Sequence, residues 1–116
     1  MTLRTAAVLL VGVCCGAAGE HAIMRAQSAS TAPDALQAAP GQYHLEFENE
    51  YVRVLRVHYG PHEKGETHEH ILNRVVLYLN DQPNAKADDV RVAGAATHAE
   101  ENASAQPADR IAVELK

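Results

Sequence analysis

The sequence predicts an all-β domain, an antiparallel barrel or sandwich, in the last two thirds of the chain. Short stretches rich in β-branched and aromatic residues recur beyond position 42. Gly, Pro, Asn and Asp separate these stretches, as expected for tight turns. No stretch in this region has a convincing helical pattern, and 116 residues leave room for one domain. Roughly seven short strands are therefore expected.

Residues 1–27 have the layout of a secretory signal peptide. Arg4 precedes an apolar run over residues 6–13, and small residues follow that run. Cleavage is expected near Ala18 or Gly19, or further on near Ala26. The alternative is an uncleaved anchor, although the run is shorter than the roughly 20 residues of a spanning helix. A periplasmic or secreted protein is predicted, with membrane contact only through this segment if it stays uncleaved.

Composition excludes several classes of function. Both cysteines, Cys14 and Cys15, lie in the leader, so a processed chain has no disulfide, thiolate metal site or cysteine nucleophile. The formal charge of −5 argues against nucleic acid as a partner. Residues 28–42 are mostly Ala, Ser and Pro and are predicted to be a flexible linker before a domain over residues 43–116. A short helix over residues 34–39 would end at Pro40 and Gly41.

The strands can be placed by pattern and by the turns between them. The apolar positions of the clearest strand change phase between Val54 and Leu55, which indicates either a bulge or burial on both faces. The last strand places Ile111, Val113 and Leu115 on one face, with Ala112 and Glu114 on the other. In order, strands are expected over residues 43–47, 51–59, 66–70, 74–80, 88–92 and 109–116, with a bend at Gly94 before His98.

The stretch GPHEKGETHEH, residues 60–70, carries the strongest functional signal. In an extended strand His68 and His70 point to the same face, with Glu66 one step before them. Two imidazoles on one strand make half of a metal site, and His98 is the histidine that lies far downstream. The alternative is a solvated edge strand kept polar against aggregation.

The stretches FENEYVRVLRVHYGPHEK, THEH, RVVLYL, THAEEN and IAVELK resemble those of small single-domain cupins, particularly short exported ones. The resemblance implies a small antiparallel jelly-roll β-barrel. In cupins a His-x-His pair with a following Glu, and a second motif with a His and then an Asn, hold one divalent metal. By position the resemblance implies His68, His70 and His98 as ligands, and Asn102 matches the second motif's asparagine.

The chain departs from the cupin pattern at several places, among them a first-motif glycine that would fall near His62 and a Pro-x-Gly that is replaced around Gly94. The family's glutamate would fall at Arg74 or Val75, so it is absent. Two further cupin strands have no obvious counterpart in NDQPNAKADDVRVAGAA, so the barrel is expected to be incomplete. Lost strands expose sheet edges and a short chain has a small core, and both features favour a homodimer.

Other side chains could take the place of the missing glutamate. Glu66 is the nearest replacement as a metal ligand, and His62 is the next. Glu100 and Glu101 could instead orient His98.

Two functions are consistent with these patterns. The first is a barrel that binds one divalent transition metal (Zn, Fe, Mn, Ni or Cu) and a small-molecule ligand, and the resemblance implies oxygenase or isomerase chemistry. The second is a non-catalytic, degenerate module that binds or self-associates without metal. A closed pocket on which the histidines converge would favour the first.

Overall fold

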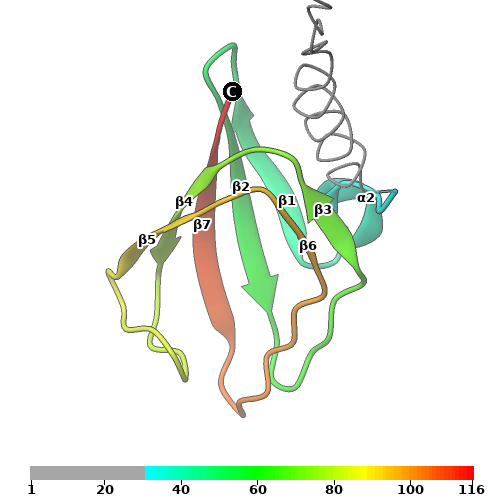
Figure 1. The fold of residues 1–116 in the computed structure, drawn as a ribbon. Coiled ribbons are helices and arrows are strands. Elements are labelled where there is room, and N and C mark those ends of the chain that lie inside the picture. Colours follow the sequence, from blue (N-terminus) through cyan, green and yellow to red (C-terminus); the bar gives the residue numbers. More distant parts are fainter. Residues whose placement is uncertain (1–30) are drawn as a thin grey trace, which may run out of the picture.

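Seven antiparallel strands form two sheets in the computed structural model, which describes residues 31–116 (Figure 1). The predicted leader, 1–27, and residues 28–30 lie outside the described residues. The larger sheet has the strand order β1-β2-β7-β4-β5, and the smaller one pairs β3 with β6. The strands of the larger sheet are β1 (Tyr43–Glu48), β2 (Val52–Tyr59), β7 (Ala108–Leu115), β4 (Arg74–Tyr78) and β5 (Val90–Ala93). Those of the smaller sheet are β3 (His68–His70) and β6 (Ala96–His98).

The second half of the predicted linker is packed against the barrel, so it is not a flexible tether. Residues 35–38 form the short helix α2 (Ala35–Ala38), whose first turn is capped by the Asp34 side chain. Ala35 and Ala39 are fully buried in the core. The alanines that led to the linker assignment are small enough to let this turn pack closely against the core. Within the described range, no helix is long and apolar enough to cross a membrane.

The core lies on the inner face of the larger sheet. Leu55, Val57 and Tyr59 alternate along β2 and are all buried. Val52 and Val54 point to the outer face, so β2 carries apolar residues on both faces. The predicted bulge is in the neighbouring strand β1, between Leu45 and Phe47, opposite the position where the phase changes.

The face of β7 that points into the core is the one that carries the charged residue Glu114. Ala112 and Glu114 are buried, whereas Leu115 is exposed and Ile111 and Val113 are half-buried. The strand lies in the middle of the larger sheet, between β2 and β4. Alternation fixes which residues share a face, but packing decides which face points inward.

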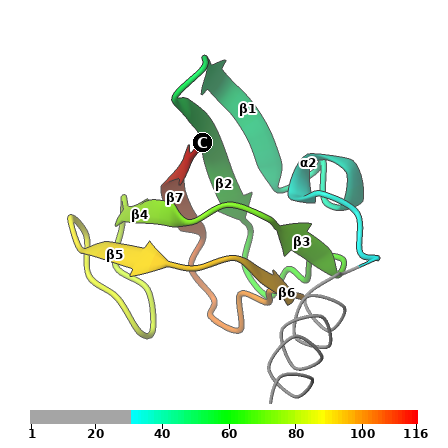
Figure 2. The ribbon, with the colours of Figure 1, turned by 45° about the horizontal axis from the view of Figure 1, so that its top comes forward.

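The middle of the chain is more complete than the sequence indicates. The strand expected over residues 88–92 is β5, which pairs with β4, and a further strand, β6, begins at Ala96 and pairs with β3. Figure 2 shows the small β3–β6 sheet lying across from the larger sheet. The Tyr43 ring of β1 contacts the His68 ring of β3, with ring centroids 4.9 Å apart, so the two sheets face each other across the core.

Candidate metal centre

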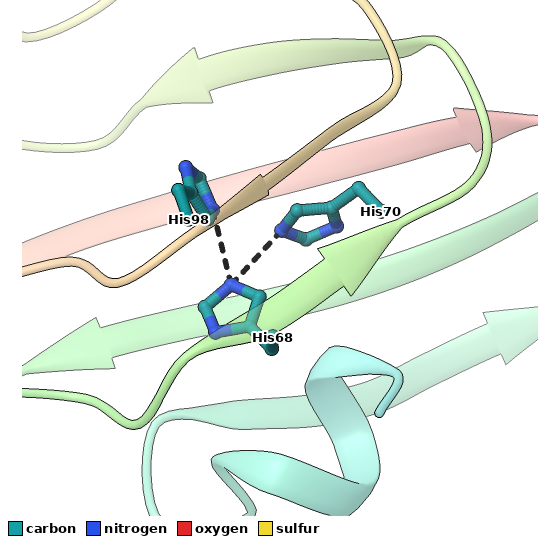
Figure 3. Close-up of side chains that lie close together, drawn as sticks. All are labelled: His68, His70 and His98. Carbon is teal, nitrogen blue, oxygen red and sulfur yellow. Dashed lines mark hydrogen bonds between the residues drawn. The ribbon is translucent and has the colours of Figure 1, made fainter. Parts of the chain in front are cut away.

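The pairing of two short strands brings the three predicted histidines together. His68 in β3 lies opposite His98 in β6, although 30 positions separate them, and His70 shares the inward face of β3. Figure 3 shows the three rings converging on one point. The Nε2 atom of His68 lies 3.1 Å from that of His70 and 3.0 Å from that of His98. We call His68, His70 and His98 the histidine cluster.

These distances suit a shared metal ion. Nitrogen ligands bound about 2.1 Å from one metal, at angles from roughly 90° to 110°, lie about 3.0 to 3.4 Å apart. The candidate ligand atoms all lie within 4.8 Å of one another, and His68 and His70 are buried. Three imidazoles would leave coordination positions free for a further ligand.

The ring tautomers are fixed by the opposite nitrogens. The Nδ1–H of His68 donates to the Glu66 carbonyl at 2.8 Å, and the Nδ1–H of His70 donates to the Glu114 carboxylate at 3.0 Å. A neutral imidazole with a proton on Nδ1 presents a lone pair on Nε2. In these neutral tautomers the Nε2 lone pairs of His68 and His70 face each other at 3.1 Å, a repulsion that a bound cation would remove.

Glu114 is a part of the site that the sequence reading missed. Its carboxylate is wholly buried, accepts from His70 and also pairs with Arg53. Arg53 in turn donates to Asp34 at 2.6 Å, so the network runs from the cluster to the start of α2. The histidine-orienting carboxylate thus comes from β7, not from the histidine motif. The feature of the sequence that could have indicated this role is that Glu114 is an acidic residue on the face of β7 that carries Ala108 and Ala112.

Burial favours the neutral imidazole at His68 and at His98. Desolvation lowers the pKa of His68, and the neighbouring His70 and Arg74 lower it further against the hydrogen bond to the Glu66 carbonyl. Desolvation also lowers the pKa of His98, although the Glu100 carboxylate acts in the opposite direction. Neutral imidazole is the form that binds metals.

Glu100 lies beside the cluster, as predicted, and Glu101 does not. The Glu100 carboxylate is 3.6 Å from His98 Nε2 and pairs with Arg110 at 2.8 Å. Burial opposes its ionisation, but Arg110 and His98 outweigh burial and hold the pKa of Glu100 below its usual range. Glu101 is exposed and lies 3.6 Å from Lys64.

The other predicted site residues have different positions. The Glu66 side chain is exposed, because β3 begins only at His68, and Glu66 serves the site through its carbonyl. His62 is exposed, with a left-handed φ of 56°. Asn102 is buried, but its amide donates to the carbonyls of Gly60 and Gln106 and so ties loops together. The Glu66 side chain is therefore not placed as the metal ligand predicted for it, and neither His62 nor Asn102 takes that role.

A cavity of about 180 Å³ adjoins the cluster on the inner face of the larger sheet. We call it the inner cavity. Its walls include apolar groups from β2, β4 and β7, among them Val57, Val76 and Ala112. Its polar lining comes from His70, Tyr43, Tyr78, Glu100, Arg74, Arg91 and Arg110. Arg74 points inward and Val75 outward, so a guanidinium stands where the resemblance implies a carboxylate ligand.

Comparison with known proteins gives matches in structure. No protein-family model matches the sequence, and a search of curated proteins finds no match. A cupin domain from Bordetella pertussis Tohama I is similar over 76% of this chain and 99% of its own, with 17% identity and a TM-score of 0.59. A conserved protein with a double-stranded β-helix domain from Klebsiella pneumoniae is similar over 75% of this chain and 90% of its own, with 17% identity and a TM-score of 0.51. With its two facing sheets and converging histidines, the protein is a small domain with the cupin fold.

Proposed function

We propose that the protein binds one divalent transition metal through His68, His70 and His98 and presents it to a small molecule in the inner cavity. The observation that carries this proposal is the pair of Nε2 lone pairs that face each other at 3.1 Å in a buried site. A metal ion between them turns a repulsion into two bonds.

The surrounding residues support a binding site of this kind. Glu114 and the Glu66 carbonyl hold two imidazoles in the ligating tautomer, and Arg53 holds Glu114. His70 is both a candidate ligand and part of the cavity wall, so a molecule in the cavity would lie next to the metal. When bound, a metal ion with free coordination positions supplies Lewis acidity or, for Fe, Mn or Cu, redox chemistry.

Metal content tests the proposal directly. The purified full chain is analysed by mass spectrometry beside a His68→Ala, His98→Ala double variant. A double variant at two exposed histidines, His44→Ala and His58→Ala, is the matched control. About one equivalent of metal in the wild type and the control, and none in the cluster variant, is the expected result. Equal content in all three, or a folded wild type that takes up no added Zn, Fe, Mn, Ni or Cu, would instead favour the non-catalytic module.

We also propose that the protein acts outside the cytoplasm, in the periplasm or as a secreted protein. The support is the leader layout of residues 1–27, with Arg4 before an apolar run and then small residues. The N-terminal residue of the protein recovered from an exporting host, determined by mass spectrometry, tests this. An intact Met1 in a cytoplasmic fraction would contradict it.

We further propose that a second copy of the chain covers the outer face of the larger sheet. One row of apolar side chains crosses all five strands of that face: Val92, Val75, Val113, Val54 and Phe47. Val92 is 78% exposed and Phe47 53% exposed, and Val90 in the next row is 62% exposed. Such a row exceeds the scattered apolar residues of an ordinary monomer surface.

A further inference from the structure

We propose that the ligand of the inner cavity is a small carboxylate, and that Arg74 binds its carboxylate group beside the histidine cluster. The inference deepens the proposed function, on which it rests for the metal next to the ligand. The resemblance implies a metal-ligating glutamate at Arg74 or Val75, whereas the inference gives Arg74 a role in binding the ligand.

Arg74 is a buried cation that lacks an anionic partner in the described part of the chain. It is 7% exposed, and its guanidinium makes one hydrogen bond, from Nη1 to the Gly94 carbonyl at 2.8 Å. No carboxylate of residues 31–116 lies within ion-pair distance of it. A buried charge without a partner is unfavourable, so an anion that reaches the Arg74 guanidinium would be bound by it.

Two half-buried arginines near the site show what Arg74 lacks. Arg53 pairs with both Asp34 and Glu114, and Arg110 pairs with Glu100 through two nitrogens. Glu114 is the register partner of Arg74 across the β4–β7 ladder, but its two oxygens are taken by Arg53 and His70. An anion from outside the chain would therefore complete the charge balance at Arg74.

The position of Arg74 puts that anion next to the cluster. Arg74 and His70 line the same cavity. Guanidinium has donors but no acceptor, so it cannot ligate a metal, whereas its planar fork matches the two oxygens of a carboxylate.

The size and the walls of the cavity narrow the class of ligand. A cavity of about 150 Å³ holds benzene, so the volume of about 180 Å³ fits a molecule of similar or slightly larger size. Val57, Val76 and Ala112 provide an apolar wall for a short carbon chain. The remaining cationic groups are matched, Arg110 by Glu100 and Arg91 by Asp89 at 3.6 Å, so one anionic group per ligand is expected. A short-chain monocarboxylate meets these conditions.

Isothermal titration of the full chain with butyrate tests the inference, in metal-loaded and chelator-treated samples. Butyramide has the same shape without the charge, and inorganic phosphate is an anion without the carbon chain. The variants are Arg74→Gln, Arg74→Lys and, as a control, Arg56→Gln, which removes an exposed guanidinium paired with Glu46. Metal content and the midpoint of thermal unfolding are measured for every variant.

We expect butyrate to bind the wild type and R56Q, and to bind R74Q at least tenfold more weakly, with R74K between them. Butyramide and phosphate should bind the wild type at least tenfold more weakly than butyrate. R74Q should keep about one equivalent of metal and unfold, without ligand, at the same or a higher temperature than the wild type. Butyrate should raise the unfolding temperature of the wild type but not that of R74Q.

Equal affinity for butyrate and butyramide, equal affinity of R74Q and the wild type for butyrate, or a preference for phosphate would each overturn the inference. The inference would also be overturned if ligand-free R74Q unfolds at a much lower temperature than the wild type and the wild type binds no butyrate. That combination would show that Arg74 has a structural role. Arg74-dependent binding of butyrate by a chain that binds no metal would support the carboxylate site and refute the metal proposal, so the two failures can be told apart.

Discussion

Replacement of Glu114 by Gln removes one negative charge from the network that orients the cluster and keeps nearly the same shape. The carboxylate is buried, accepts from His70 Nδ1 at 3.0 Å and pairs with Arg53. A hydrogen bond to a charged group contributes about 1.5 to 3 kcal/mol. Gln keeps one acceptor oxygen but turns its NH₂ group toward the other donor. We therefore expect E114Q to lower the free energy of unfolding by about 2 to 4 kcal/mol.

The exposed pair between Glu46 and Arg56 provides the matched control. Both side chains are more than 40% exposed, so solvent screens the same Glu–Arg contact. E46Q should lower the free energy of unfolding by less than about 1 kcal/mol. Urea unfolding of the chelator-treated proteins, followed by far-UV circular dichroism because the chain has no Trp, measures both differences.

Metal affinity gives an independent readout of the same variant. Loss of an orienting carboxylate typically weakens metal binding by about 10- to 100-fold. Competition with a chromogenic chelator should show this loss for E114Q and not for E46Q. If E114Q is no less stable than E46Q and binds metal as tightly as the wild type, the network does not hold the cluster and the reasoning is refuted.

Three further outcomes are expected. Desolvation lowers the folded-state pKa values of His68 and His98, so the unfolded chain takes up protons first as the pH drops. The unfolding temperature of the metal-free protein should therefore fall as the pH drops through the unfolded-state histidine pKa of about 6.5. An unfolding temperature that does not fall between about pH 7.5 and 5.5 would contradict this. Gly65→Ala should lower the free energy of unfolding in urea by about 1 to 3 kcal/mol, because the added Cβ would lie 2.4 Å from the hydroxyl oxygen of buried Tyr59. The control Gly41→Ala should leave it unchanged, since its Cβ would meet nothing within 4 Å. Val92→Glu should convert the proposed dimer to a monomer in analytical ultracentrifugation, and Ile71→Glu, at another exposed site between β3 and β4, should not. Two monomeric variants, or two dimeric ones, would count against the outer-face interface.

The strand pattern and the two histidine motifs could be read from the sequence because both depend on local periodicity. Alternation puts His68 and His70 on one face whatever the strand pairs with. The strands over residues 52–59 and 74–78 follow from their β-branched content, and the resemblance on the two motifs gave the fold. The helical turn at residues 35–38 could be drawn from the sequence but was assigned to the linker, because burial of its alanines, not its composition, decides whether it packs.

Only the tertiary structure decided which way the faces point and which distant strands meet. Ile111, Val113 and Leu115 make the more apolar face of β7, yet Glu114 faces inward. It does so because half-buried Arg53 and buried His70 supply the partners that a buried carboxylate needs. The inward position of Arg74 follows from the same register. The sequence by itself determined the histidines, the strands and the fold they resemble. The pairing of β3 with β6 and the charge balance of the cavity depend on contacts between residues far apart in the chain, and local pattern carries no information about them.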